Sequence, residues 1–203
     1  MHHRNPAPHR AKSLGWNPFR RTAVCVGGFF TLLFGVSAQA STYCAHDSVA
    51  LASDLTDVST GGGANGHDNI IHLVAGTFTT SGAPFNFTTA SGFALTIDGG
   101  YDATCTNQDL TPGSTILDGG NLTRVLTIQT NGAISVRHVT IQHALYDGSA
   151  GAAGQIYLGL GTSGVATFDD NVVRDNVSGY SVGGFVFFGN GTVHIDNNLF
   201  VGN

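Results

Sequence analysis

Residues 166–173 read ATFDDNVV, and residues 193–200, 27 positions later, read VHIDNNLF. Apolar positions of the first segment coincide with apolar positions of the second, and an Asp and an Asn recur at the fourth and sixth places. The same offset aligns residues 158–160 with residues 185–187, again apolar on apolar. It also aligns residues 139–141 with the start of the first segment. The C-terminal third therefore reads as an internal repeat with this constant offset.

Each repeated segment alternates apolar and polar residues and is bounded by Gly or Asn, which is typical of strands rather than helices. The unit is too short for a propeller blade of roughly 40–45 residues, and it lacks the leucine and asparagine spacing of leucine-rich repeats. A coil of short parallel strands fits better, with turns stacked about 4.8 Å apart around one apolar core. The sequence therefore predicts an all-β fold, a parallel β-helix or solenoid.

Stacked turns would bring equivalent asparagines together at the bends. Asn171 would lie over Asn198, and Asn176 over Asn203. Stacked amides hydrogen-bond along the axis as a ladder, and Asn tolerates the left-handed backbone that a sharp bend needs. We interpret these four residues as a turn ladder, with ligand binding as the alternative.

The residues before the first predicted strand indicate a helix that caps the coil. Asp47 or Ser48 can begin a short helix that carries Leu51, Leu55 and Val58 on one face. A helix there would cover the first unpaired strand edge of the coil. Further strands are predicted at residues 70–74, 93–97, 115–117, 124–128 and 134–136.

The first 40 residues have the order of a secretory signal peptide: a basic segment, an uncharged apolar segment, and Ala38-Gln39-Ala40 as a small-x-small cleavage pattern. We expect cleavage after Ala40. The alternative is an uncleaved membrane anchor, because the uncharged segment of residues 22–40 approaches the roughly 20 residues that a span needs. The expected organisation is a signal peptide at 1–40 and a β-helix domain at 41–203, divided into a cap at 41–68 and coils at 69–203.

The chain after residue 40 is strongly acidic. Five of the eight basic residues precede residue 22, which leaves three arginines against 13 aspartates and a net charge of −10 with His neutral. A nucleic-acid partner requires a basic face, and an anionic membrane surface would repel this chain. We therefore expect no nucleic-acid partner and no membrane insertion of the domain.

Two of the three cysteines, Cys44 and Cys105, remain once Cys25 leaves with the leader. An even pair in an exported chain predicts one disulfide, worth about 3–4 kcal/mol for a loop of roughly 60 residues. The alternative is two free thiols. Neither cysteine has a partner at zinc-finger spacing, and the six histidines after residue 40 are scattered, so no metal site is expected.

Three segments resemble a known family: residues 65–78 (NGHDNIIHLVAGTF), 95–102 (LTIDGGYD) and 115–120 (TILDGG). They are similar to the opening turns of right-handed parallel β-helix proteins with a pectin-lyase-like fold, in the bacterial exported and polymorphic outer-membrane type. The resemblance covers nearly all of residues 44–203. It implies the fold more strongly than an activity, because the family combines polysaccharide lyases, hydrolases and adhesin-like proteins.

The resemblance also directs attention to acidic clusters, because lyases of this family use Asp-bound Ca²⁺ with an Arg or Lys base. Asp169, Asp170, Arg174 and Asp175 are the weak catalytic candidates with that composition. The alternative is a solvated, turn-forming Asp/Asn face, which we favour, so that no catalytic residue is assigned. Ca²⁺ held loosely by stacked Asp169 and Asp196 stays open, and no other cofactor is expected.

The chain stops at Asn203 without a capping element, which predicts a fragment whose missing part carries further coils, an anchor or an active site. We expect an exported, cell-surface or outer-membrane solenoid with a structural or adhesin-like binding role, and a periplasmic location as the alternative. Its expected partners are carbohydrate or another surface protein. The alternative function is the N-terminal part of a polysaccharide lyase or glycoside hydrolase acting on acidic polysaccharide, so enzyme activity stays undecided.

Overall fold

A computed structural model describes residues 40–111, 113–148, 151–159, 164–179 and 182–203 of the 203-residue chain. The predictions made on residues 1–39, including the leader and Cys25, lie outside the described residues, as does Leu160 of the predicted repeat. No helix within the described ranges is both long and apolar enough to cross a membrane.

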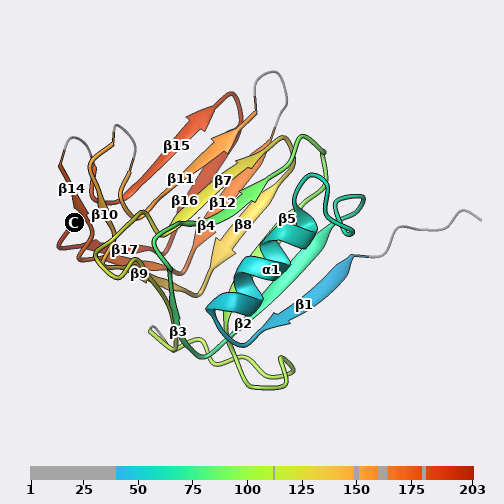
Figure 1. Ribbon diagram of the computed structural model, residues 1–203, viewed down its shortest axis with the longest axis horizontal. Coiled ribbons are helices and arrows are strands. Elements are labelled where there is room, and N and C mark those ends of the chain that lie inside the picture. The colour runs from blue at the N-terminus through green and yellow to red at the C-terminus, as the bar shows by residue number, and fades with distance from the viewer. Residues whose placement is uncertain (1–39, 112, 149–150, 160–163, 180–181) are drawn as a thin grey trace, which may run out of the picture. The chain divides into compact units, whose positions relative to one another are not determined.

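Three parallel sheets run along the coil (Figure 1). As the chain winds, consecutive strands after the first one belong to different sheets. Sheet A contains β1 (Ser41–Ala45), β2 (Asn69–Val74), β5 (Leu95–Tyr101), β8 (Ile134–Arg137), β12 (Val165–Asp169) and β16 (Thr192–Asp196). Sheet B contains β3 (Gly76–Thr79), β6 (Thr115–Asp118), β9 (Thr140–Gln142), β13 (Val172–Arg174) and β17 (Leu199–Val201). Sheet C contains β4 (Phe85–Thr88), β7 (Leu126–Thr130), β11 (Gly154–Leu158) and β15 (Phe185–Gly189), and a two-stranded sheet pairs β10 (Leu145–Tyr146) with β14 (Val177–Ser178).

Neighbouring strands in all of these sheets are parallel. Side chains that point inward stack in rows, such as Ile97, Val136 and Phe168, which lie at paired positions of sheet A and are at most 1% exposed. Alternate residues point outward, as the two-residue period of a strand requires. The predicted all-β parallel solenoid is confirmed.

The predicted capping helix is present as α1 (Ser48–Val58). Asp47 caps it, and its carboxylate accepts hydrogen bonds from the N–H groups of Val49 and Ala50 at 2.9 and 2.8 Å. Leu51, Leu55 and Val58 on the inner face of α1 are buried. The helix packs on the first strands of the three sheets, at the N-terminal end of the coil in Figure 1.

The predicted constant repeat length is wrong. The offset holds between the last two turns of sheet A, where Phe168 pairs with Ile195, but one turn earlier Phe168 pairs with Val136 rather than with Ile141. In sheet C, Phe185 pairs with Gly154 rather than with Leu158. The connection between β11 and β12 spans residues 159–164, whereas β15 and β16 are joined by residues 190–191. The number of residues per turn therefore varies, because the connections between strands differ in length. Strand pairing does not constrain these connections.

Buried asparagines join the turns at the corners on either side of sheet B. The Oδ1 atom of Asn171 accepts the N–H of Val139 at 3.1 Å, and its Nδ2 donates to the carbonyl of Val136 at 2.9 Å. The N–H of Asn171 in turn donates to Oδ1 of Asn198 at 2.9 Å. Each of these bonds joins residues of two adjacent turns.

The second corner repeats the arrangement with Asn176. Its Oδ1 accepts the N–H of Ala144 at 2.9 Å, and its Nδ2 donates to the carbonyl of Ile141 at 3.1 Å. Nδ2 also donates to Oδ1 of Asn203 at 2.8 Å, which is a direct amide–amide bond. The other hydrogen bonds of the Asn171 and Asn176 side chains go to backbone groups of the preceding turn. The asparagines thus provide partners for buried backbone groups that lie outside the strand ladders.

Replacing Asn176 by Ala should lower the free energy of unfolding by about 1–3 kcal/mol, because a buried N–H and a buried carbonyl lose their partner. Urea unfolding followed by circular dichroism measures the change. The matched control is Asn86→Ala, which removes an exposed amide on β4 and should change stability by less than about 0.5 kcal/mol. Equal losses in the two variants would show that the corner amide does not stabilise the coil.

Candidate functional site

One row of side chains lies at the corner where the chain leaves sheet A for sheet B. The residues that follow β8, β12 and β16 are His138, Asp170 and Asn197, and all three have a left-handed backbone with φ of 55°, 54° and 55°. They occupy the same position in successive turns, and the next residue is the corner asparagine in the later two turns and Val139 in the first. Because parallel strands lie about 4.8 Å apart, side chains in such a row come within contact distance of one another.

His138 is held by a buried carboxylate from the preceding turn. Its Nδ1 lies 2.7 Å from Oδ1 of Asp98, whose side chain is only 4% exposed. Asp98 also accepts hydrogen bonds from Nε of Arg137 at 3.1 Å and from Nε2 of Gln108 at 2.8 Å. An ionised carboxylate only accepts, so Nδ1 of His138 carries the proton and, in the neutral ring, Nε2 carries the lone pair.

The free side of His138 faces Asp170. Its Nε2 lies 3.6 Å from Oδ2 of Asp170, whose side chain is 46% exposed. Both residues line a hollow of about 300 Å³. We call it the corner hollow, and it is lined by Leu110, His138, Asp170, Asn171, Val172, Asn197 and Leu199. It thus combines three aliphatic side chains with a carboxylate, an imidazole and two amides.

The loop that joins β5 to β6, residues 102–114, reaches the corner hollow. It contributes Leu110 to the lining, and its Gln108 reaches Asp98 and also lies 3.2 Å from Nδ1 of His138. The loop therefore helps to fix both Asp98 and His138, although neither residue belongs to it.

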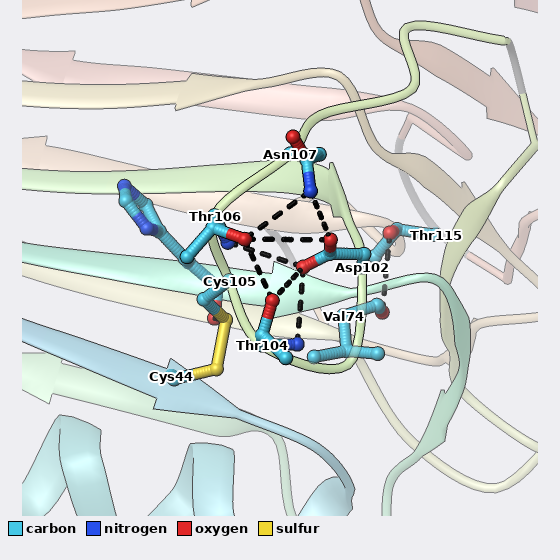
Figure 2. The surroundings of a disulfide bond; sticks show 9 residues. Cys44, Val74, Asp102, Thr104, Cys105, Thr106, Asn107 and Thr115 are labelled. Carbon is cyan, nitrogen blue, oxygen red and sulfur yellow. Dashed lines mark hydrogen bonds between the residues drawn. A yellow bond between two sulfur atoms is a disulfide. The ribbon is translucent and has the colours of Figure 1, made fainter.

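Two features hold this loop in place, and Figure 2 shows both. The predicted disulfide is present: Cys44 on β1 is bonded to Cys105 in the loop. Asp102, the first residue of the loop, accepts hydrogen bonds from the side chains of Asn107 and Thr104 at 2.6 and 2.8 Å. These bonds, together with the N–H groups of residues 104 and 106, hold the pKa of Asp102 far below its ordinary value.

The corner on the other side of sheet B holds a related group. Nδ1 of His143 lies 2.9 Å from Oδ2 of Asp118, and Nε2 of Gln142 donates to the same oxygen at 2.8 Å. Burial raises the pKa of Asp118, but the hydrogen bonds from Gln142, the N–H of Gly120 and His143 outweigh it and leave the pKa below its ordinary value. Nε of Arg174 donates to Oε1 of Gln142 at 2.9 Å, which extends the row by one turn.

The four weak catalytic candidates do not form one cluster. Asp169 points outward from sheet A, opposite Arg137 and Asp196 in the pairing register, and Asp170 lies at the first corner. Arg174 is on the outer face of sheet B, and Asp175 is the left-handed residue of the second corner. Of the four, the structure places Asp170 in the corner hollow, so the hollow contains no Arg–Asp combination of the kind the resemblance suggested.

Asp98 and His138 were not identified from the sequence as site residues. They are 40 residues apart, and no single local motif contains both. The usable signal is positional: Arg137 and Asp169 end strands of sheet A, and His138 and Asp170 directly follow them, before the next strand of sheet B begins. That signal requires the true alignment of Arg137 with Asp169, which the assumed constant repeat obscured.

A larger cavity, of about 1060 Å³, lies at the cap beside the C-terminal end of α1. The hydroxyl of Tyr43 donates to Oδ2 of Asp57 at 2.5 Å, and the N–H of Gly63 donates to Oδ1 of Asp57 at 2.9 Å. Burial and then the neighbouring Asp57 raise the pKa of Tyr43 to about 12. Asp57 thus holds the glycine-rich segment against β1, and we assign it a structural role.

Asp118→Asn should reduce the sensitivity of the fold to acid. Because the folded-state pKa of Asp118 lies below the unfolded value of about 3.9, its ionised form adds stability above about pH 4 that is lost as the pH falls through the folded value. Urea unfolding between about pH 6 and pH 2.5 should therefore show a shallower acid-side loss in the variant. Asp147→Asn, which removes an exposed loop carboxylate, is the control. Superimposable profiles for wild type and Asp118→Asn would contradict this assignment.

The chain matches no protein-family model, no curated protein and no solved structure. The resemblance to pectin-lyase-like proteins therefore rests on residues 65–78, 95–102 and 115–120 alone. The structure shows a parallel β-solenoid. A functional assignment has to come from the geometry of the corner hollow and its surroundings.

Proposed function

We propose that this chain is an exported or cell-surface β-solenoid with an adhesin-like role, and that it binds a neutral carbohydrate in the corner hollow. The observation that carries the proposal is the hollow itself, which joins an aliphatic wall to a few convergent polar groups. Sites for small ligands typically combine these two features.

The lining of the hollow suits a sugar. The C–H face of a pyranose can pack against the three aliphatic side chains of the hollow, those of Leu110, Val172 and Leu199. Asp170 can accept hydrogen bonds from hydroxyl groups, and Asn197 can both donate and accept them. The stacked turns hold these groups on a rigid frame, which limits the entropy lost on binding.

The charge of the domain favours a neutral ligand over an acidic polysaccharide. Each arginine after residue 40 is already engaged within the fold: Nε of Arg124 donates to the carbonyl of Gly151, Arg137 pairs with Asp98, and Arg174 bonds Gln142. A polyanion would meet an excess of aspartates, of which Asp170 lies in the hollow itself. For this reason we favour binding over cleavage of an acidic polysaccharide.

Export is supported by the leader-like segment and by the disulfide. Disulfides persist in oxidising compartments and are rare in the cytosol. The loop that Cys105 anchors also borders the hollow, so the proposed site and the proposed compartment depend on the same covalent bond.

The export proposal predicts that the full chain, produced in a bacterial host, loses its leader at Ala40. Mass spectrometry of the protein recovered outside the cytoplasm should show a chain that begins at Ser41. This chain should be lighter than its reduced form by the mass of two hydrogen atoms, because Cys44 and Cys105 are bonded. Recovery of an intact, reduced chain from the cytoplasm alone would refute export.

The binding proposal predicts that the exported protein binds a neutral oligosaccharide. Isothermal titration with cellohexaose, maltohexaose and chitohexaose should detect binding of at least one, and polygalacturonate should bind more weakly. Leu110→Asp should weaken binding about tenfold or more, because it places a charge in the apolar wall. Leu122→Asp is the matched control, since it adds the same charge at another exposed leucine, in the turn between β6 and β7.

Three results would reject neutral-glycan binding in the hollow. These are the absence of binding by all three oligosaccharides, tighter binding of polygalacturonate, and an equal loss of affinity in the two leucine variants. Circular dichroism of both variants checks that each retains the β-rich fold.

A further inference from the structure

We infer that His138 and Asp170 form a binding site for a divalent transition-metal ion such as Zn²⁺, open to the corner hollow. This site goes beyond the proposed glycan binding and stands on separate observations. They are the distance between two donor atoms, the carboxylate that orients the imidazole, and the comparison with the second corner.

The spacing of the two donor atoms suits one metal ion between them. Nε2 of His138 and Oδ2 of Asp170 are 3.6 Å apart. With bonds of about 2.0–2.1 Å, two ligand atoms of a tetrahedral zinc ion are separated by about 3.3–3.4 Å. Closing the difference takes a few tenths of an ångström, and the half-exposed side chain of Asp170 has room to make that movement.

The surroundings of His138 supply the orientation that metal-binding histidines have. Such histidines almost always donate their other ring N–H to a carboxylate or a carbonyl, which fixes the tautomer and raises the basicity of the ligating nitrogen. Here Asp98 is that carboxylate, at 2.7 Å from Nδ1, and it is buried. Arg137 and Gln108 hold Asp98 in turn, so the lone pair of Nε2 is directed away from Asp98.

Two electron-rich atoms that face each other at this distance are stabilised by a cation between them. A proton on Nε2 is one such cation, and a metal ion is the other. Imidazole with a carboxylate favours zinc, copper and nickel over calcium and magnesium, which prefer oxygen ligands. The choice of metal therefore follows from the donor set.

The protein contributes two strong ligands, and the rest of the coordination sphere is open. Among the described residues, no three His, Cys, Asp or Glu side chains are grouped to hold a metal. Asn197 lines the same hollow, and because its Nδ2 lies 3.3 Å from Asp169, its amide oxygen is the remaining donor. Water or the hydroxyl groups of a bound molecule would complete the site from the hollow.

The second corner provides a matched comparison inside the same protein. His143 also has a left-handed backbone, with φ of 51°, and its Nδ1 is also held by a carboxylate, that of Asp118. In the part of the chain that the structure describes, no carboxylate lies within 4.0 Å of its Nε2. His143 thus has the orienting carboxylate without the second ligand.

Zinc titration of four proteins tests the inference: the exported wild type and the variants His138→Asn, Asp170→Asn and His143→Asn. Asparagine is chosen because it tolerates the left-handed backbone at all three positions. Calorimetry at about pH 7.5, where an ordinary imidazole is neutral, should show one site in wild type and in His143→Asn. The same site should be weakened about tenfold or more, or lost, in His138→Asn and Asp170→Asn.

A second readout locates the ion without any glycan. Nitrogen-15 NMR of the imidazole rings should show the Nε2 signal of His138 shifting on addition of Zn²⁺, while the signals of His143 stay in place. Absence of zinc binding up to about 1 mM, or equal losses in the His138 and His143 variants, would overturn the inference. Urea unfolding of each variant confirms that it is folded. Because no sugar is present, the result is independent of the glycan-binding test.

Discussion

The hydrogen bonds from corner asparagines to the backbone of the preceding turn are the interaction on which the coil depends. A parallel ladder pairs the strands but stops at each bend, where backbone groups would otherwise be buried without partners. Asn171 and Asn176 bond these groups and, through Asn198 and Asn203, continue the connection into the next turn. They keep equivalent positions of neighbouring turns above one another, which makes the inward apolar rows continuous.

The same alignment creates the candidate site. His138 and Asp170 follow the paired last residues of β8 and β12 and both have a left-handed backbone, so their side chains meet across adjacent turns. Asp98, at the position of β5 that pairs with Arg137, reaches His138 from the turn before, so the three residues lie across three turns although no two of them belong to one motif. The imidazole of His138 lies between the carboxylates of Asp98 and Asp170, which would otherwise repel one another.

The loop of residues 102–114 shows how an irregular segment becomes part of a rigid site. Loops of this kind usually have higher mobility than the strands they connect. Here a disulfide to β1 and the hydrogen bonds around Asp102 hold it, and it carries Leu110 and Gln108 to the edge of the corner hollow. One of the three aliphatic side chains of the hollow and one of the hydrogen bonds to Asp98 therefore come from a segment outside the regular turns.

Features that depend on near neighbours could be predicted from the amino-acid sequence alone. Strand alternation around Phe168, the cap at Asp47 and the buried face of α1 follow from patterns within a few residues, and the cysteine pair follows from simple counting. Only the tertiary structure decided the turn lengths and the pairing of Asp98 with His138. Connections outside the ladders can lengthen without disturbing the stacked strands, so sequence spacing alone does not reveal which residues lie one turn apart.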